Sequence, residues 1–301
     1  MIIKPRVETE ELIVLRYLNN RLKLSANELS YYLNLEKGFI GEISFDEWMK
    51  GVNQNWLILN DLLLENNNSI FQIDSLLFGL NKLLIFEIKN YEGDFYLEGE
   101  RWYSSTNLEI KNPLHQLRKS ESLLRSLLQK NGINLPIESY LIFVNPEFHL
   151  YNAIQNSPII FPPQINRFMK KLNENTIPTT NKQINIAQKI SSLHLNYSPF
   201  SRIPPYQYTD LQKGVFCKTC SSLTSQHNRN LLICQKCGEK ETITSGILRT
   251  VAEFKTLFPT KQLETNIIHE WCKVIKSKKS IRRVLKENFT MVGHSGASHF
   301  L

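Results

Sequence analysis

Apolar residues in the first half of the chain are concentrated in short runs, and polar turn residues separate these runs. The composition typical of largely buried strands, rich in leucine, isoleucine, valine and phenylalanine, is found at residues 56–65, 70–78, 82–89 and 137–144. Between the second and third runs, Gly79 and Asn81 supply the residues that a tight reversal of the chain requires. The pattern therefore predicts a β-hairpin at the centre of a sheet.

Helical periodicity is found before, between and after these runs. The segments whose spacing predicts helices are residues 8–19, 26–35, 42–52, 114–129, 164–173, 180–192, 245–258, 260–276 and 280–288. We expect Gly38 and Gly41 to separate the second helix from the third, and Ser280 to cap the last one. A short polar hairpin is predicted at residues 94–104. Helices and strands together predict an α/β fold.

Three charged residues interrupt the apolar hairpin. If the hairpin is symmetric about Leu80 and Asn81, Asp74 lies opposite Glu87, and opposed residues project from the same side of a sheet. The period of two along a strand places Lys89 on that side as well. Two carboxylates and an ammonium group are therefore expected to converge on strands that are otherwise apolar.

This trio is compatible with two kinds of site. Burial of an unpaired charge is costly, whereas a hard divalent cation compensates carboxylates. Asp74 and Glu87, with the backbone carbonyl of Ile88 between them, suit Mg²⁺ or Mn²⁺. Lys89 would then orient or deprotonate an attacking water and stabilise charge on a scissile phosphate. The same residues also fit a structural ion pair between a carboxylate and Lys89.

The order of these residues resembles the nuclease-related family known as NERD. The residues that carry the resemblance are Gly41-Glu42, Asp74, Glu87-Ile88-Lys89, Gly93, Trp102, Asn112-Pro113-Leu114 and Gln116. The resemblance implies a restriction-endonuclease-like core with the order αβββαβ and a mixed sheet, which the predicted elements match. It also implies metal binding by Asp74 and Glu87, a catalytic role for Lys89, and auxiliary site roles for Glu42 and Gln116. An acidic residue near a helix start and an exposed glutamine are the alternative interpretations of the last two.

Four of the five cysteines form a second motif, C-x₂-C-x₁₃-C-x₂-C, made by Cys217, Cys220, Cys234 and Cys237. This spacing is close to that of a four-cysteine zinc ribbon, in which each C-x₂-C turn presents two thiolates to one tetrahedral ion. Such a zinc ion is structural, because four protein ligands leave no open position. Two disulfides are the alternative, which a reducing compartment disfavours. Cys272 stands apart and is expected to be a packing residue.

Charge is divided unevenly along the chain. Residues 1–150 hold 15 Lys and Arg against 20 Asp and Glu, whereas residues 151–301 hold 21 against 8. The basic half suits a polyanion such as DNA, although a basic surface without a partner is the alternative. The positive residues expected to contact nucleic acid, in a segment that loosely resembles a helix-turn-helix, are Lys273, Lys276, Lys278, Lys279, Arg282, Arg283 and Lys286. A helical hairpin that docks on the acidic half would have the same composition.

No apolar run approaches the length of a membrane span, and proline and charge interrupt the first six residues, so we expect a cytoplasmic protein without a membrane partner. Five consecutive segments are expected: N-terminal helices at 1–37, the nuclease-like domain at 38–150, a proline-rich connector at 151–210, the zinc ribbon at 211–243 and basic helices at 244–301. The sequence predicts a Mg²⁺- or Mn²⁺-dependent DNA nuclease with structural zinc. The alternatives are a non-cleaving DNA-binding or adaptor protein, and a zinc-dependent interaction scaffold.

Overall fold

The computed structural model describes residues 1–197, 199–293 and 298–301, and these form two compact units. Unit 1 comprises Met1–Glu8 and Leu33–Ser201, and unit 2 comprises Thr9–Tyr32 and Arg202–Leu301. Helix α2 (Ala26–Met49) continues across the boundary between them. The grouping differs from the five consecutive segments expected from the sequence, because α1 (Glu10–Arg21) packs against the C-terminal helix α6 (Ile243–Leu257) and Thr9–Tyr32 belong to unit 2.

Unit 1 is a mixed α/β structure. Its remaining elements are β1 (Ile2–Lys4), β2 (Leu57–Asn66), β3 (Ser69–Gly79), β4 (Lys82–Lys89), β5 (Gly93–Glu98), β6 (Arg101–Ser104), β7 (Glu109–Ile110), α3 (Pro113–Lys130), β8 (Ile137–Phe143), β9 (Phe148–Tyr151), β10 (Ile159–Ile160), a 3₁₀ turn (Pro162–Gln164), α4 (Ile165–Asn173) and α5 (Asn181–Ser192). The main sheet has the strand order β1-β2-β3-β4-β8-β10, and a smaller sheet has the order β7-β6-β5-β9. The β2-β3-β4 ribbon is antiparallel, and β1, β8 and β10 join in parallel.

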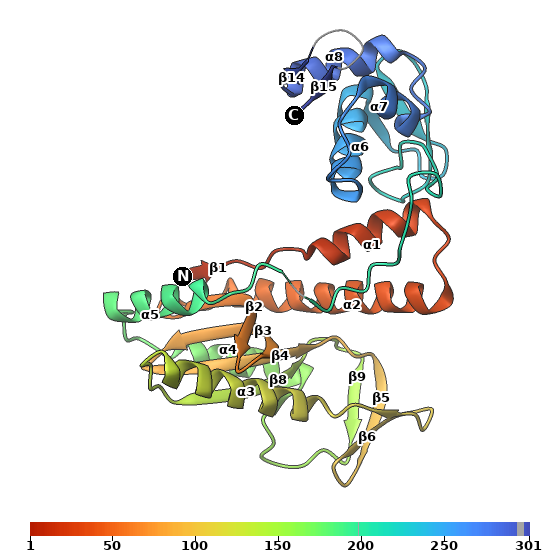
Figure 1. The fold of residues 1–301 in the computed structure, drawn as a ribbon. Helices are drawn as coiled ribbons and strands as arrows, with labels where there is room; N and C mark the ends of the chain where they lie inside the picture. The colour runs from red at the N-terminus through yellow and green to blue at the C-terminus, as the bar shows by residue number, and fades with distance from the viewer. Residues whose placement is uncertain (198, 294–297) are drawn as a thin grey trace. The chain divides into compact units, whose positions relative to one another are not determined.

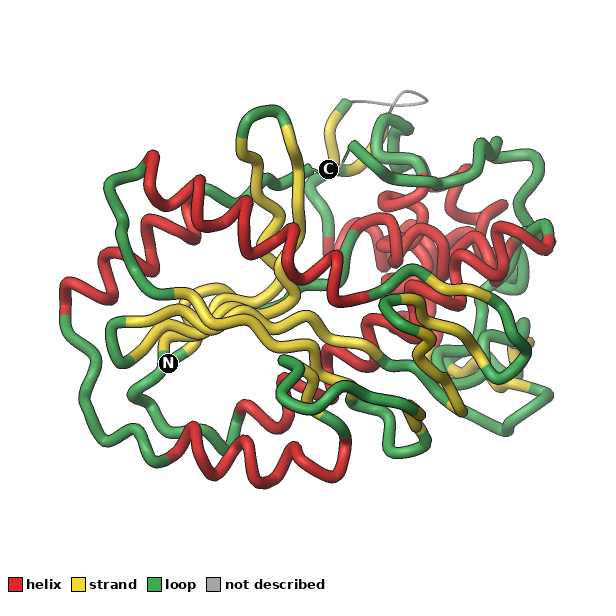
Figure 2. Tube along the Cα trace, turned by 90° about the horizontal axis from the view of Figure 1, so that it is seen from below, coloured by secondary structure: helices red, strands yellow, loops and turns green. Residues whose placement is uncertain are grey.

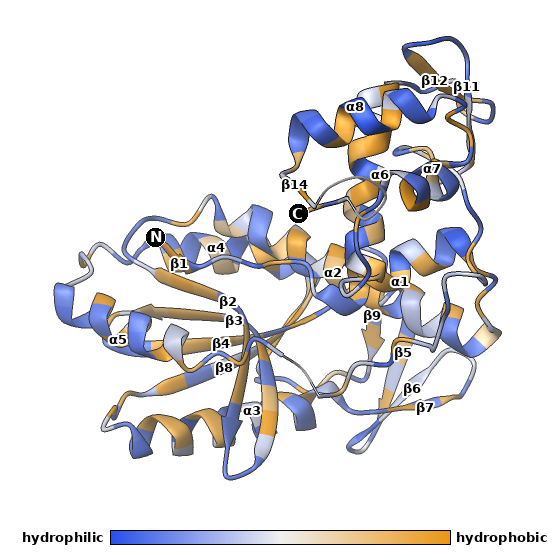
Figure 3. Ribbon diagram, turned by 45° about the horizontal axis from the view of Figure 1, so that its top comes forward, coloured by the Kyte–Doolittle hydropathy of each residue, from blue (hydrophilic) through white to orange (hydrophobic). Residues whose placement is uncertain are grey.

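Helices cover both faces of the main sheet (Figure 2). One face packs against α3 and α5 through a cluster that includes Leu76, Leu124 and Ile190. The opposite face packs against α2 and α4 through a second cluster that includes Phe45 and Phe86. The central strands are therefore apolar on both sides, as their colouring in Figure 3 shows, and a charged residue among them needs a specific partner.

The predicted hairpin has the expected register. Ser75 pairs with Phe86 and Gly79 pairs with Lys82, so paired residue numbers add to 161 as the symmetric turn requires. The ladder ends at Ser75–Phe86, so the expected pair of Asp74 and Glu87 is not part of it. Leu80 and Asn81 at the turn both have positive φ values, of 51° and 54°, which is the conformation of a two-residue hairpin loop whose twist matches the strands.

An irregularity in the β2-β3 ladder was not anticipated from the sequence. The pairs Asn60–Ser75 and Leu62–Ile73 are formed, but Asp61 and Asp74 between them are not paired. Asp61 has a φ of 51°, and Ser75 Oγ donates a hydrogen bond to Asn60 Oδ1 at 2.8 Å. In a regular strand, side chains alternate between the two faces, so Ile73 and Leu76 would lie on opposite faces of the sheet. Both lie in the same apolar cluster, which shows that the alternation is interrupted between them. The irregularity frees the backbone of Asp74 for other partners.

The expected break at Gly38 and Gly41 is wrong, because α2 runs through both residues without interruption. Glycine at position 41 has a packing role instead. A Cβ atom there would lie 2.6 Å from Asn90 Cβ, so only glycine lets the helix approach the chain just after β4 this closely. The predicted helix over residues 42–52 is therefore the second half of α2.

Unit 2 contains a small sheet and a group of helices. Its elements, besides α1, are β11 (Thr224–Gln226), β12 (Leu231–Cys234), β13 (Lys240–Thr242), α6 (Ile243–Leu257), α7 (Thr265–Cys272), α8 (Lys278–Asn288), β14 (Met291–Val292) and β15 (His299–Phe300). Strands β11, β12 and β13 form an antiparallel sheet, and α6, α7 and α8 lie together (Figure 1). No helix among the described residues combines the length and the apolar content needed to cross a membrane.

Two predicted helices in unit 2 have wrong boundaries. The segment at 260–276 is helical only over α7, since Leu263 before it is extended and accepts a hydrogen bond from the N–H of Phe300 at 2.9 Å. Lys273 after it has a φ of 47°, which ends the helix. The cap of α8 is Ser277, whose side chain accepts from the N–H of Ser280, so Ser280 lies inside the helix.

The proline-rich connector expected at residues 151–210 includes residue 198, which lies outside the described residues, and the end of this connector is packed in unit 2. The ring of Tyr208 lies 5.5 Å from that of Trp271 and 5.7 Å from that of Phe258. Tyr206 donates its hydroxyl hydrogen bond to the carbonyl of Leu257 at 2.8 Å. Both tyrosines therefore belong to the core of unit 2.

A fully buried arginine attaches α1 to unit 2. Arg21 Nη2 and Nε donate to the two carboxylate oxygens of Glu253 at 2.6 and 2.7 Å, and its side chain is 0% exposed. It also donates to the carbonyls of Gln212 and Gly214, and its guanidinium lies 3.9 Å from the centre of the Trp271 ring. Arginine has the planar, forked donor set that this environment requires, and lysine does not.

Replacement of Arg21 by methionine leaves Glu253 buried without a partner, which costs about 3–5 kcal/mol of stability. Amide hydrogen exchange in α1 and α6 should become at least about 100-fold faster, measured by mass spectrometry. Lys23→Met, at an exposed position two residues away, is the matched control and should leave exchange unchanged. Equal protection in Arg21→Met and the control would contradict this role of Arg21.

Candidate functional site

The structure brings together the three charged residues of the hairpin, Asp74 from the middle of β3 and Glu87 and Lys89 from the end of β4. Lys89 Nζ donates to Glu87 Oε1 at 2.6 Å, and Asp74 Oδ2 accepts from the N–H of Ile88 at 2.7 Å. Asp74 and Glu87 are buried, with exposed fractions of 7% and 2%, and the Lys89 side chain is 19% exposed. The ammonium group is therefore the part of the trio nearest to solvent.

Gln116 also joins this group. It lies in the first turn of α3, whose start is fixed by Pro113 and by Asn112, the capping residue that accepts from the N–H of Leu114. Gln116 is exposed, and its Oε1 accepts from Lys89 Nζ at 3.3 Å. The helix start thus presents an uncharged polar side chain to the solvent side of Lys89.

Glu42 has a different partner, which the sequence reasoning missed. Arg6 Nη1 donates to Glu42 Oε2 at 2.6 Å, and Arg6 Nε donates to Asp46 Oδ2 at 2.9 Å. Arg6 Nη2 donates to the backbone carbonyl of Asp74 at 2.8 Å, where the strand ladder is interrupted. The Arg6 side chain is only 2% exposed. Arg6 therefore connects α2 to the backbone of the strand that carries Asp74.

A signal for this contact exists in the sequence. Glu42 and Asp46 are four residues apart, so they share one face of a helix whose neighbouring residues Phe45 and Met49 are apolar. Two carboxylates on a packed helix require a cation. The pattern does not say which of the basic residues supplies it, because Arg6 lies far away in sequence.

Burial and mutual repulsion make these carboxyl groups hard to ionise. Burial, and next the negative charge of Asp74, raise the pKa of Glu87 to about 8 and that of Glu42 to about 8. Burial also raises the pKa of Asp74. For Lys89, burial favours the neutral amine, but Glu87 and Asp74 outweigh it and raise the pKa. Lys89 is therefore an ammonium ion at neutral pH.

The charge of the site is suited to a divalent cation. Four carboxyl groups, those of Glu42, Asp46, Asp74 and Glu87, face two cationic side chains, Arg6 and Lys89. When all four are ionised, two negative charges are not neutralised. Carboxylate oxygens and a backbone carbonyl such as that of Ile88 are the ligands that Mg²⁺ and Mn²⁺ prefer. The donor set therefore fits such an ion.

The cysteine motif also converges. The sulfur atoms of Cys217, Cys220, Cys234 and Cys237 all lie within 4.8 Å of one another, and none of these cysteines is in a disulfide. The Sγ–Sγ distances are 3.6 Å for Cys217–Cys237 and 3.4 Å for Cys220–Cys234. A tetrahedral zinc ion with Zn–S bonds of about 2.3 Å requires sulfur atoms about 3.8 Å apart. Within the described chain, this is the only group of three or more such side chains gathered this closely, and it could hold a metal ion.

Two turns of the same geometry present these thiols. In the first, the N–H of Cys217 donates to the carbonyl of Ser222, and the N–H of Ser221 donates to the carbonyl of Cys217. In the second, Cys234 pairs in the same way with Glu239 and Gly238. The fifth residue of each turn has positive φ, 55° at Ser221 and 75° at Gly238. Glycine favours positive φ, so the sequence indicates this conformation at Gly238 but not at Ser221.

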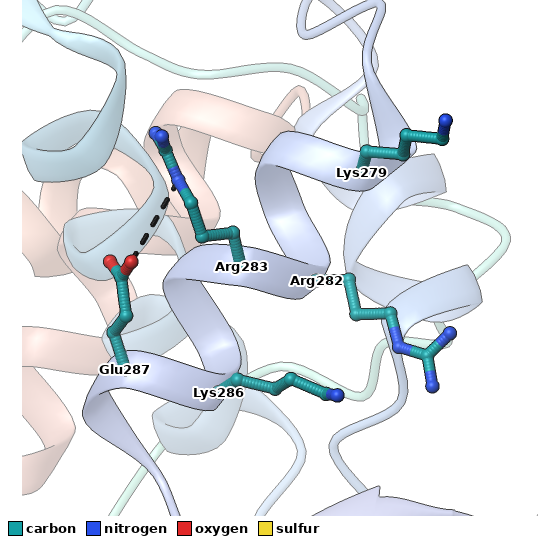
Figure 4. Close-up of a pocket in the computed structure, with 5 residues that line it drawn as sticks. All are labelled: Lys279, Arg282, Arg283, Lys286 and Glu287. Carbon is teal, nitrogen blue, oxygen red and sulfur yellow. Dashed lines mark ion pairs between the residues drawn. The ribbon is translucent and has the colours of Figure 1, made fainter.

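The predicted basic residues of the C-terminal region are all exposed. Lys273 and Lys276 lie in the turn between α7 and α8, and the other five lie on α8. Four of these five, together with Glu287, line an open depression of ≈ 560 Å³. They are Lys279, Arg282, Arg283 and Lys286 (Figure 4). Cys272 is fully buried beside Trp271, as expected of a packing residue.

Comparison with known proteins identifies a class for part of the chain. A family model described as a nuclease-related domain, NERD, matches residues 37–144. The match includes Glu42, Asp74, Glu87, Lys89 and Gln116, and it leaves out Arg6, the four clustered cysteines and α8. No curated protein and no solved structure matches the chain. Residues 37–144 are therefore similar to the nuclease-related family, and the C-terminal region has no counterpart in these comparisons.

Arg6→Met removes the cation that holds Glu42 and Asp46, and we expect a loss of about 3–5 kcal/mol in urea unfolding at pH 8. Because the pKa of Glu42 is raised to about 8, protonation below that pH removes the unpaired charge, and the deficit should shrink toward pH 5. Lys37→Met, which breaks an exposed pair with Glu92, is the control and should change stability by about 0.5 kcal/mol or less. A deficit that does not depend on pH would contradict the electrostatic role of Arg6.

Cys237→Ser should lower the bound zinc of purified protein from one equivalent to well below one, measured by elemental analysis, because three ligands remain. Cys272→Ser is the matched control, since Cys272 is buried outside the cluster, and it should retain the full equivalent. Wild-type protein without zinc when prepared in zinc-containing medium would show that the cluster is not a zinc site.

Proposed function

We propose that the chain is a divalent-metal-dependent nuclease that acts on DNA, with its catalytic site in unit 1. The observation that carries the proposal is the convergence of Asp74, Glu87 and Lys89 on one hairpin, inside the segment that the nuclease-related family model matches. The succession α2, β2, β3, β4, α3 and β8, in which the antiparallel hairpin is followed by a parallel strand, supports a restriction-endonuclease-like core.

In this proposal, Asp74, Glu87 and the Ile88 carbonyl hold Mg²⁺ or Mn²⁺. A bound ion of this kind supplies Lewis-acid polarisation of a phosphate oxygen and lowers the pKa of a coordinated water. Lys89 would compete with such a cation for Glu87, because Lys89 Nζ lies 2.6 Å from Glu87 Oε1. Asp74, Glu87 and Ile88 would therefore supply the metal ligands, and Lys89 is the cation that occupies Glu87 when no metal ion is bound.

Lys89 would face the substrate on the solvent side of the site, where its Nζ also donates to Gln116. As an ammonium ion it donates hydrogen bonds to a phosphodiester oxygen and stabilises the charge that develops during hydrolysis. Gln116 orients Lys89 or the attacking water through its side-chain amide. Glu42 acts with Arg6, which holds the backbone of Asp74 and so fixes the direction of its carboxylate.

The four cysteines bind structural zinc in this proposal. The three short strands β11, β12 and β13 have little apolar surface of their own, so the metal supplies part of the folding free energy of this ribbon. The basic residues of the turn before α8 and of α8 contact the phosphate backbone of DNA, which supplies most of a sequence-independent affinity. Unit 2 thus binds the polymer that unit 1 cleaves.

The test is digestion of linear, circular and single-stranded DNA by purified protein with Mg²⁺ or Mn²⁺. Asp74→Ala and Lys89→Ala should each reduce the cleavage rate by at least about 100-fold, since each removes a group that touches the cation or the phosphate. Below pH 8 the rate should fall, because protons compete with the cation for carboxyl groups whose pKa is about 8. Asp94→Ala and Lys111→Ala, at exposed positions, are the controls.

Absence of metal-dependent cleavage of all three DNA forms would reject the nuclease and leave a DNA-binding protein. Cleavage that Asp74→Ala does not reduce would place the activity elsewhere, or in a contaminant. Binding should be measured in parallel by fluorescence anisotropy, so that loss of cleavage is separated from loss of affinity.

A further inference from the structure

Helices α6, α7 and α8 form one packed group with a common apolar interior. Side chains from all three, with exposed fractions of 0%, meet there; they are Ile247, Val251, Phe254, Ile268, Trp271, Ile281, Val284 and Leu285. Helix α7 has eight residues and α8 has eleven, and a turn of five residues joins them. Two short helices joined by a short turn, with a third packed against them, have the order of elements found in a helix-turn-helix, although this turn is one residue longer than the usual three or four.

Three extended segments support this group. Leu263, between α6 and α7, pairs with Phe300 of β15, and β15 pairs with β14, which follows α8 directly. The chain that leaves α8 therefore returns to the segment that precedes α7. The N–H of Lys276, in the turn, donates to Gln226 Oε1 of β11 at 3.1 Å, so the ribbon also contacts the turn. Both ends of α8 are held by neighbouring structure.

The outer face of α8 is basic and largely unpaired. Ile281, Val284 and Leu285 face the interior, while Lys279, Arg282 and Lys286 project outward at spacings of three and four residues (Figure 4). Arg283 lies on the other side of this row, with its Nε 3.9 Å from Glu287 Oε1. Among the described residues, the three outward cations form no ion pair. Three neighbouring uncompensated charges on a rigid helix suit a regular array of phosphates.

We propose that α8 is a recognition helix that enters the major groove of double-stranded DNA, a refinement that rests on the proposed DNA-directed function. A helix of eleven residues is about 16 Å long, and Lys279 and Lys286 are about 10 Å apart along its axis. The major groove of B-form DNA is about 12 Å wide and admits one helix. The cations at the two ends of the row can therefore reach phosphates on either side of the groove.

The surface of unit 2 favours duplex DNA over single strands and RNA. Proteins that bind single strands stack the bases on exposed aromatic side chains. In unit 2, the part of the chain that the structure describes has no aromatic residue among its exposed large apolar side chains, which are aliphatic or methionine. Double-stranded RNA has a deep, narrow major groove that a helix does not enter. B-form duplex is the nucleic acid whose groove matches α8.

The test uses the full chain carrying Asp74→Ala, so that the probe is not cut and zinc is retained. Fluorescence anisotropy compares a 24-base-pair DNA duplex, a single strand of the same length and an RNA duplex of the same sequence. We expect the DNA duplex to bind at least about tenfold more tightly than the other two. Replacing Lys279, Arg282 and Lys286 with alanine should weaken duplex binding by about 30-fold and reduce the slope of log affinity against log salt by about 3.

The matched control removes the same charge from unit 1. Arg167, Lys170 and Lys171 are exposed on α4 and line a second open depression, and their replacement by alanine should change duplex affinity by less than about threefold. Far-ultraviolet circular dichroism and zinc content verify that both triple variants are folded. The recognition-helix proposal would be overturned if all three nucleic acids bound equally well. It would also be overturned if both triple variants lost duplex affinity equally, or if the α8 triple variant lost none.

The outcome separates this inference from the proposed catalytic function. If Asp74-dependent cleavage is observed but the α8 variant binds duplex normally, the nuclease assignment stands and the inference fails. If binding depends on α8 but no metal supports cleavage, α8 is a duplex-binding helix in a protein that does not cut.

Discussion

Compensation of buried carboxylates is the constraint around which unit 1 is organised. The central strands are apolar on both faces, yet Asp74 and Glu87 lie on them, and Glu42 and Asp46 face the same region from α2. Arg6 and Lys89 neutralise part of this charge, and the irregularity at Asp61 and Asp74 opens the ladder so that Arg6 can reach a strand carbonyl. The remaining negative charge is what makes a divalent cation a chemically suitable occupant.

Each unit thus depends on one buried arginine from the first 21 residues. Arg6 holds α2 and the strand of Asp74 in unit 1, and Arg21 holds Glu253 and the ring of Trp271 in unit 2. Neither arginine lies in the segment that the family model matches. A buried arginine that donates a hydrogen bond from each of its three guanidinium nitrogens fixes several distant segments at once, because its planar fork tolerates few arrangements. The start of the chain therefore has a structural role in both units.

Local patterns were sufficient for much of the fold. The hairpin turn, its register and the closing strand followed from alternation, turn residues and apolar runs, and the cysteine spacing led to a cluster of four thiols. Helix boundaries were less predictable. Gly38 and Gly41 look like a break in isolation, but α2 continues through both and passes close to Asn90 at Gly41, and Leu263 is extended where it pairs with Phe300. In both cases a contact distant in sequence overrides local preference.

By itself, the sequence determined which residues are candidates for chemistry, since strand period, turn type and cysteine spacing are set by neighbours along the chain. Tertiary structure alone decided which cation neutralises Glu42, that Gln116 reaches Lys89, and that α1 belongs with the C-terminal helices. It also decided that the chain after α8 returns to Leu263. The physical reason is that these contacts join residues tens to hundreds of positions apart, so no periodicity or local motif encodes the pairing.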